Sequence, residues 1–292
     1  MSFAILTDTS ANLPSELLEK LNITAVPFSY FVLGEECVCA DTRSFDGEAY
    51  YTMIQKGVHV TTAQINPQRF IDYMEPILKE GSDILYIGMS SGISGAYQSA
   101  EMAAEELRET YPERKICVFD TRAASLGEGN MVVMAAEAKA AGEDLGAVLG
   151  RLHLWRERTY QVFTVDSLMH LRRSGRLSNA AAIVGTVLQI KPLLKGNKDG
   201  QIVAFQKVRG RRNAIAALAD KYDELVMDAP NQVLGIAHAN APEEAAELAK
   251  LLQRNHPPKE ILTVMYEPVT GAHVGPGTVA LFFLGDMNVR SK

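Results

Sequence analysis

Cysteine is scarce in this chain of 292 residues, which contains only Cys37, Cys39 and Cys117. Three unevenly spaced cysteines do not make a disulfide framework, and such sparse use is typical of proteins from a reducing compartment. The pair Cys37 and Cys39 could begin a metal or redox site, but no second cysteine pair or neighbouring histidine completes a ligand set. We therefore expect neither a disulfide-stabilised fold nor a metal site.

Long apolar runs and an excess of basic residues are also missing. No stretch approaches the roughly 20 apolar residues of a membrane-spanning helix, and the segment from Met1 to Asp8 lacks the basic flank of a secretion signal. The formal net charge of −6 argues against a nucleic-acid-binding protein. We expect a cytoplasmic protein that neither inserts stably into a membrane nor binds nucleic acid.

Signatures of nucleotide binding are absent too. The sequence has no Gly-x-Gly-x-x-Gly motif and no Walker A motif. No loop combines carboxylates for Mg²⁺ with a lysine for phosphate, as an active kinase requires. We therefore expect no dinucleotide site, no kinase activity of the chain itself and no cofactor.

The hydrophobic content, 47%, is sufficient for two packed cores. In the first half, apolar runs at Ile84–Met89 and Ile116–Asp120 are each followed by a helical pattern, over 96–110 and 129–141. This order predicts a parallel sheet in a Rossmann-like domain. A charged helix over 145–159 then leads into a second region. We predict two α/β domains, 1–155 and 156–292.

The second half reads as a mixed sheet. Strands are expected at 160–165, 233–238, 261–265 and 278–284, and a hairpin turn at 196–200 joins two further strands. An apolar helix is expected over 180–189. This pattern predicts a C-terminal domain that is α/β but not purely parallel.

The loop from Ser90 to Gly95 is the strongest functional signal. It joins an apolar strand to a helix, so free backbone N–H groups and a helix N-terminus are expected to converge there on an anion. Ser94 adds a hydroxyl donor, and Gly95 lets a ligand approach the backbone. Ser and Gly also make ordinary helix caps and turns, so the motif alone does not decide the function.

Two other segments carry polar groups suited to an anion. Thr61 and Thr62 lie in a polar connection before the helix expected at 67–79, where an ordinary turn is the alternative interpretation. His273 lies in a glycine-rich loop between strands, and a histidine beside an anion is favoured as the cation. A lone histidine is more often structural, but the flanking glycines favour a ligand role. In open α/β sheets ligands bind at the carboxyl ends of the strands, so we expect the strand-end loops Thr7–Ser10, Ser90–Gly95 and Asp120–Arg122 to meet at one site.

Arginines cluster in one short stretch of this acidic chain, at Arg172, Arg173 and Arg176. Guanidinium groups at this density suit a phosphate or an acidic partner surface. Solvated surface arginines are the alternative, and we favour a partner surface.

A serine hydrolase is the main enzymatic alternative, with Ser94, Asp120 and His273 in the chain order of α/β-hydrolases. The Ser90-Ser91 pair lengthens the turn beyond a nucleophile elbow, and no oxyanion loop of the HGGG type is present. A third interpretation is an anion-sensing regulatory module, which would change a partner's affinity without acyl transfer.

Several motifs taken together resemble the bacterial DegV family over essentially the whole chain. They are Thr7–Pro14, Thr61–Gln64, Ser91–Ala100, Leu171–Ser178, Ile190–Leu194 and His273–Gly277. The resemblance implies a two-domain α/β fold that buries a long-chain fatty acid at the domain interface. By the same resemblance, Thr62 and Ser94 would bind the carboxylate and His273 would lie close to it.

The best-understood members of this family are the binding subunits of bacterial fatty acid kinase. The resemblance therefore implies a carrier without catalytic machinery, which presents the carboxylate to a separate kinase and carries the acyl phosphate toward phospholipid synthesis. Arg172, Arg173 and Arg176 would then face the kinase. The chain departs from the family pattern at Ala63, where serine is usual, and at Ser174, where glycine is common. Ala63 removes one hydroxyl beside the expected site.

Overall fold

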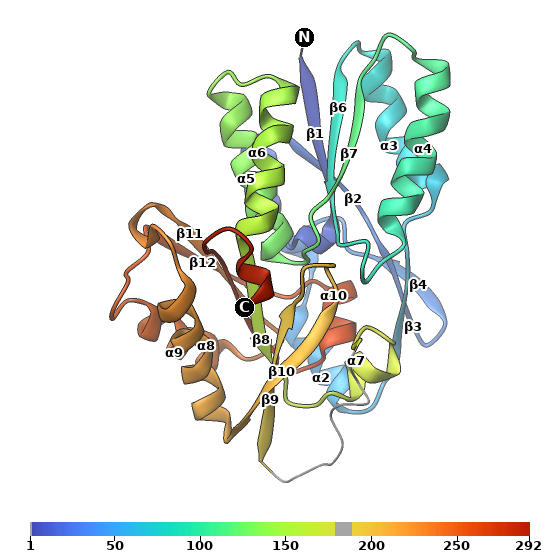
Figure 1. The fold of residues 1–292 in the computed structure, drawn as a ribbon. Coiled ribbons are helices and arrows are strands. Elements are labelled where there is room, and N and C mark those ends of the chain that lie inside the picture. The colour runs from blue at the N-terminus through green and yellow to red at the C-terminus, as the bar shows by residue number, and fades with distance from the viewer. Residues whose placement is uncertain (1, 179–188) are drawn as a thin grey trace.

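A parallel four-stranded sheet organises the N-terminal half of the molecule in the computed structural model, which describes residues 2–178 and 189–292 (Figure 1). Its strands lie in the order β2-β1-β6-β7, so the connections from β2 to β6 and from β6 to β7 run in the same direction across the sheet. The strands are β1 (Phe3–Asp8), β2 (Ile23–Val26), β6 (Asp83–Gly88) and β7 (Ile116–Asp120). The parallel sheet predicted from the alternation of strand and helix patterns is confirmed.

Helices cover both faces of this sheet, as Figure 1 shows. One face carries α5 (Leu126–Ala140) and α6 (Leu145–Arg158), and the other carries α3 (Pro67–Lys79) and α4 (Ala96–Thr110). Strand β6 is buried on both sides, because Leu85 and Ile87 pack toward α5 while Ile84 and Tyr86 pack toward α3 and α4. Successive side chains of a strand point to opposite faces, so a sheet covered twice needs a continuous apolar strand.

A small antiparallel sheet lies beside the parallel one, in the order β4-β3-β5. It consists of β3 (Ser29–Val32), β4 (Glu35–Val38) and β5 (Val60–Ala63), with α2 (Gly47–Gln55) between the last two. The expectation of a polar connection at Thr61–Gln64 was wrong for most of this segment, since Thr62 pairs with Tyr30 in the ladder. Strand β5 is short and largely polar, so no apolar run marks it in the sequence.

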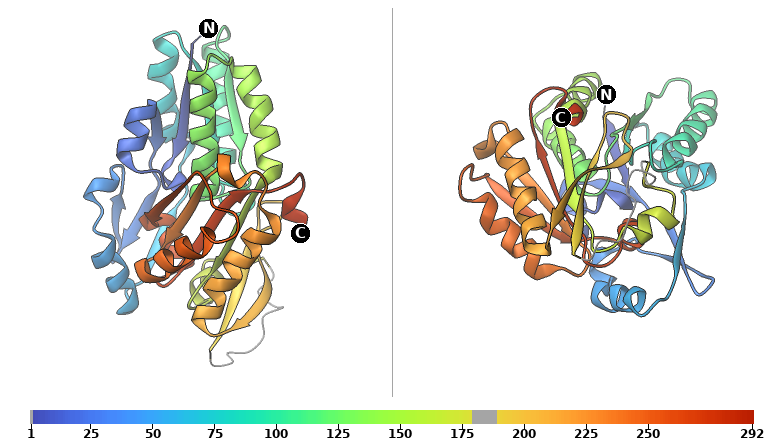
Figure 2. Two further views of the ribbon diagram at one scale, coloured as in Figure 1. Left: turned by 90° about the vertical axis from the view of Figure 1, so that its left-hand side faces the viewer. Right: turned by 60° about the horizontal axis from the view of Figure 1, so that its bottom comes forward.

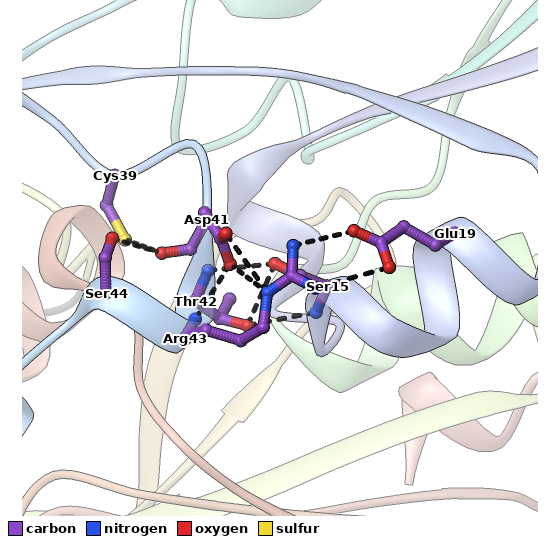
Figure 3. A network of polar contacts seen from close by, with 7 residues as sticks. All are labelled: Ser15, Glu19, Cys39, Asp41, Thr42, Arg43 and Ser44. Carbon is purple, nitrogen blue, oxygen red and sulfur yellow. Dashed lines mark hydrogen bonds and ion pairs between the residues drawn. The ribbon is translucent and has the colours of Figure 1, made fainter.

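The segment after β4 is fastened to α1 (Ser15–Leu21) by the polar network in Figure 3. Arg43 donates to Asp41 and to Glu19, and the Thr42 backbone N–H donates to the Ser15 hydroxyl. The ion pairs are largely exposed, so they contribute little net stability. The network fixes the path of the chain toward α2.

A mixed six-stranded sheet organises the C-terminal half, in the order β10-β9-β8-β13-β11-β12. Only β11 and β12 are parallel neighbours, and the hairpin expected at 196–200 joins β9 to β10. The strands are β8 (Thr159–Thr164), β9 (Ile190–Gly196), β10 (Ile202–Arg209), β11 (Val233–His238), β12 (Glu260–Met265) and β13 (Val279–Leu284). The predicted mixed α/β fold is confirmed.

This second sheet has one face on its own helices and one face toward the N-terminal half (Figure 2). Helices α8 (Arg211–Leu225) and α9 (Pro242–Leu252) pack over Tyr160 and Val162. Phe163 points to the opposite face of β8 and belongs to a core cluster that includes residues of α5 and α6. Since this core runs across both halves, the space between the two large sheets is largely filled by side chains.

Two short helices complete the C-terminal half, α7 (Met169–Arg173) and α10 (Pro268–Val274). The expectation that His273 lies in a loop was wrong, because it is in the last turn of α10. Glu267 caps this helix and Pro268 occupies its first turn, which outweighs the helix-breaking effect of Gly271. The apolar helix expected over 180–189 falls on residues outside those described, apart from its last position.

Short 3-10 turns occur at Thr9–Ala11, Thr42–Ser44, Ala229–Asn231 and Val289–Ser291. Arg290 in the last of these donates to the carbonyls of Thr121 and Arg122, so the C-terminus is fastened to the N-terminal half. Across residues 2–178 and 189–292, no helix has the length and apolarity needed to cross a membrane.

Candidate functional site

A cavity lies between the two large sheets and opens in part to solvent. Most of its wall is apolar and comes from both halves of the chain. The apolar side chains are those of Phe28, Met89, Ile93, Phe163, Leu171, Ile202, Val269, Val274 and Phe282.

Three residues predicted from the sequence meet in the wall of this cavity: Thr62, Ser94 and His273. The Thr62 hydroxyl lies 2.9 Å from Nε2 of His273, so β5 and α10 are joined by a hydrogen bond. Ser94 reaches the same cavity from the loop before α4, with its hydroxyl oxygen accepting the Ala96 backbone N–H. The arrangement gathers neutral hydrogen-bonding groups in an otherwise apolar space.

Thr61 and Gly95 were predicted as binding residues, but neither is in the wall of this cavity. Thr61 is exposed, as expected from the alternation of side chains along β5. Gly95 caps α4 and packs against the side chain of Gln64, where an added Cβ would lie 2.1 Å from the amide oxygen. Its role is to let Gln64 lie close to the backbone.

The backbone N–H groups of the Ser90–Gly95 loop are largely occupied, contrary to the expectation of a free anion-binding loop. Ser91 N–H donates to Asp120, and Gly92 N–H donates to the Ser90 hydroxyl. The N–H groups of Ile93 and Ser94 both donate to the Ser90 carbonyl. An anion at this end of the cavity would therefore be held mainly by side chains.

His273 is neutral at physiological pH in this structure. Burial, helped by the nearby positive charge of Arg176, lowers the pKa of His273 to about 4. The sequence analysis expects the imidazole to be cationic only beside a bound anion, and that expectation stays a prediction. A neutral imidazole can donate one hydrogen bond and accept another.

Arg176 departs from the surface position expected for it. Its guanidinium lines the cavity and donates to the carbonyls of Ile93 and Ser174. Arg172 and Arg173 are exposed on α7. The arginine cluster is therefore divided between the cavity wall and the surface.

A second, more open pocket adjoins the polar end of the cavity. Ile93, Ser94 and Arg176 line both spaces, and the outer pocket also includes Gly92, Gly95 and Gly175. The polar groups of the cavity thus lie between a buried apolar space and the protein surface.

The residues of the hydrolase alternative are not assembled as a triad. The Ser91 hydroxyl donates to Asp120 at 2.6 Å, while His273 pairs with Thr62. In the described part of the chain, no hydrogen bond links Asp120 to His273 or His273 to Ser94.

Buried carboxyl groups lie beneath the N-terminus of α10. The carboxylate oxygens of Glu267 accept the backbone N–H groups of Val269 and Thr270, which starts the helix that carries His273. Burial raises the pKa of Glu267 to about 7, with a contribution from Asp8. Burial likewise raises the pKa of Asp8 and of Glu128, whose carboxyls both accept the Ser10 hydroxyl.

Side chains of the N-terminal half hold α10 in place. The Tyr50 hydroxyl donates to the Pro268 carbonyl at 2.6 Å, and the Tyr51 hydroxyl donates to the Tyr266 carbonyl at 2.7 Å. The Asn12 amide oxygen accepts the Glu267 backbone N–H at 2.7 Å. These bonds fix the position of His273 relative to Thr62.

Sequence reasoning missed the cavity residues Ser125 and Thr270, and it placed Arg176 on a partner surface and not in the cavity wall. Thr270 precedes His273 by three positions, and residues at this spacing lie on the same face of a helix. A helix predicted at this segment would therefore have placed Thr270 beside His273. Ser125 lies in the loop after β7, at the same sheet edge as Ser94. That edge was predicted to hold the site, so the long loop after β7 was the feature of the sequence that could have indicated Ser125.

Comparison with known proteins agrees with this geometry. A family model described as "uncharacterised protein, DegV family" matches residues 2–286. The chain belongs to the DegV family. The DegV domain-containing protein CPE0026 of Clostridium perfringens is 36% identical over 284 residues, covering 97% of this chain and 98% of that protein.

Solved DegV structures share the whole fold. A fatty-acid-binding DegV family protein of Thermus thermophilus has a TM-score of 0.89 at 30% identity, over 98% of this chain and 100% of its own. DegV of Bacillus subtilis, described as a fatty acid binding protein, has a TM-score of 0.83 at 28% identity, over 98% of this chain and 100% of its own. Both relatives are described as binding fatty acids, and both share the fold of this chain.

Proposed function

We propose that this chain binds a long-chain fatty acid in the cavity between its two large sheets. The observation that carries the proposal is a partly open cavity with mostly apolar walls, in which the polar side chains of Thr62, Ser94 and His273 meet. Each buried methylene of the ligand contributes about 0.8 kcal/mol, so the acyl chain supplies most of the affinity. The polar groups of the cavity determine the direction in which the fatty acid lies. The fatty-acid-binding DegV relatives support this assignment.

In this proposal Thr62, Ser94 and His273 bind the carboxylate. Hydroxyl and imidazole donors can hold the carboxylate oxygens without enclosing them in an ion pair. Arg176 lies at the same end, with two of its nitrogens already engaged by carbonyl oxygens. Thr61 and Gly95 act indirectly, through β5 and through the packing of Gln64.

The finer proposal is a carrier that has no catalytic machinery of its own. The outer pocket gives a partner access to the end of the cavity where the carboxylate would lie. A cytoplasmic fatty acid kinase would phosphorylate the carboxylate there, and this chain would carry the acyl phosphate toward phospholipid synthesis. The exposed Arg172 and Arg173 would contact the kinase, and 1–155 and 156–292 would be the two domains around the ligand.

Mass spectrometry of ligand extracted from the purified protein tests the binding proposal. Recovery of a long-chain fatty acid supports it, and recovery of a nucleotide or a sugar phosphate in its place refutes it.

Reconstitution with a fatty acid kinase and ATP tests the carrier role. Formation of acyl phosphate that depends on this chain supports the carrier. A change in kinase affinity with no acyl transfer would indicate the anion-sensing module instead. Variants that replace Arg172 and Arg173 with glutamine should weaken the kinase reaction while fatty acid binding stays unchanged.

A further inference from the structure

Two buried hydroxyl groups in the cavity wall have no hydrogen-bond partner, those of Ser125 and Thr270. Among the described residues, they are the two cavity-lining side chains whose buried polar atoms are unpaired. Ser125 is fully buried and Thr270 is 8% exposed. A buried hydroxyl without a partner is unfavourable, so its retention points to a group that completes it.

Ser125 precedes α5 in an unusual backbone conformation, and its side chain does not cap the helix. Its φ of 52° and ψ of −141° are rare for a residue with a Cβ. A serine before a helix normally caps it through its hydroxyl. Here the Ser125 backbone carbonyl accepts the N–H groups of Glu128 and Gly129, and the hydroxyl makes no cap bond.

Thr270 shows the same pattern on α10. A threonine within a helix commonly bonds its hydroxyl to a carbonyl of the preceding turn, and Thr270 does not. It lies one helical turn before His273, on the side facing the cavity. Its hydroxyl lies near the Glu267 carboxyl, and the Ser125 hydroxyl lies near that of Tyr266, without a hydrogen bond of normal geometry in either pair.

We propose that Ser125 and Thr270 form a second polar subsite, which binds a hydroxyl group carried on the acyl chain. The inference rests on the proposed function, since it concerns the same cavity. The preferred ligand is then a hydroxy fatty acid whose carboxylate lies at Thr62 and whose chain hydroxyl reaches this subsite. Hydroxyl groups of protein and ligand can each donate and accept, so both unpaired groups are completed.

The surroundings select a neutral group over a second carboxylate. Glu267 lies beside Thr270, and Asp8 and Glu128 are buried near Glu267. A second anion would be repelled by these groups in a poorly solvated space. A dicarboxylic acid is therefore excluded as the preferred ligand.

Binding measurements on the full chain test the subsite. Delipidated protein would be titrated with stearic acid and with a series of monohydroxylated stearic acids that differ in the position of the hydroxyl. We expect one position, or two adjacent ones, to bind about tenfold more tightly than stearic acid, as one or two well-placed neutral hydrogen bonds provide.

Variants assign this preference to the two hydroxyls. Ser125→Gly removes one hydroxyl and suits the positive φ, so it should fold at least as well as the parent chain. Thr270→Val preserves the shape and removes the other. Each should reduce the preference for the hydroxylated acid over stearic acid, and the same titration measures the affinity for stearic acid itself. The exposed Thr61→Val is the matched control and should change neither.

The outcomes separate this inference from the proposed function. If stearic acid binds but no hydroxylated isomer binds more tightly, or the preference survives in both variants, the subsite is refuted and fatty acid binding stands. If no acyl chain binds at all, the proposed function fails.

Discussion

The hydroxyl of Thr62 and the imidazole of His273 are 211 positions apart in the chain and lie 2.9 Å from each other. One belongs to a strand of the small antiparallel sheet and the other to a helix of the C-terminal half. This contact lies in the cavity wall and brings together two side chains that are proposed to bind the carboxylate. Several consequences of this geometry are measurable.

Replacing the Thr62 hydroxyl should weaken fatty acid binding. Thr62→Val keeps the shape of the side chain but removes a hydrogen bond to a charged ligand, so the dissociation constant should rise about tenfold or more. Ser94→Ala should act in the same direction. Thr61→Val changes the same group on the exposed side of β5 and should have no effect. Titration calorimetry would check this, and parental affinity in both cavity variants would contradict the proposed carboxylate site.

Removing the charge of Arg176 should raise the pKa of His273. Burial is the main cause of the low pKa, and Arg176 adds to it, so Arg176→Gln should move the value upward from about 4. A bound carboxylate should raise it further, because a nearby anion favours the imidazolium. NMR titration of the histidine ring would follow both shifts. The exposed Arg172→Gln is the charge-matched control, and an equal shift in that variant would show that Arg176 has no specific effect.

Glu267 should make stability depend on pH. Burial raises its folded-state pKa from 4.5 to about 7, so its contribution to stability is fully present below about 4.5 and is lost as the pH rises through about 7. Relative to Glu267→Gln, the parent chain should lose about 3 kcal/mol of unfolding free energy across this window. His273, whose pKa is lowered, contributes in the opposite direction but is common to both proteins. Urea denaturation from pH 4.5 to 8 measures the difference.

The matched control for this experiment is the exposed Glu48→Gln, whose stability should run parallel to that of the parent chain. A difference between parent and Glu267→Gln that does not change with pH would show that Glu267 titrates normally.

Ser94 should not react as a hydrolase nucleophile. Its hydroxyl accepts the Ala96 N–H, and neither Asp120 nor His273 is hydrogen-bonded to it. A fluorophosphonate probe should therefore leave Ser94 unlabelled, as read by peptide mass spectrometry. Labelling of Ser94 that disappears in His273→Ala would restore the hydrolase interpretation.

Gly200 should be sensitive to substitution because the β9–β10 hairpin is packed against the Ser90–Gly95 loop there. An added Cβ would lie 2.0 Å from the Ser90 hydroxyl oxygen, which donates its hydrogen to the Gly200 carbonyl. With a φ of 74°, Gly200→Ala should cost about 2 kcal/mol or more of stability and weaken ligand binding. Gly34→Ala has a comparable positive φ but open space around it, so denaturation of both variants separates the clash from the backbone strain.

The parallel sheet and the hairpin were predictable because their signals are local. Ile84–Met89 is a continuous apolar run before a Ser/Gly loop, and 196–200 is a short turn between strands. Strand β5 was not predictable, since Thr61 and Thr62 gain their pairing from distant Tyr30 and its neighbours. Helix α10 was hidden by Gly271 and Gly275, and its stability depends on the Glu267 cap and on bonds from Tyr50 and Tyr51.

The candidate site, like the fold, was predictable from the sequence only in part. The types of residue that meet at the cavity were visible in the motifs around Thr62, Ser94 and His273. The direction of the Arg176 guanidinium and the unpaired Ser125 hydroxyl depend on side-chain packing between distant segments, which no local pattern encodes.

The bonds from Asn12, Tyr50 and Tyr51 to the segment around α10 have a thermodynamic consequence. They join the two halves through buried donors and acceptors, so rotating one half away from the other would leave those groups unpaired. The part of the cavity wall on α10 is thus held in position before an acyl chain arrives, which limits the conformational entropy that this segment loses on association. Ligand exchange is therefore expected to depend on local movement around the outer pocket, with the two halves remaining a single rigid body.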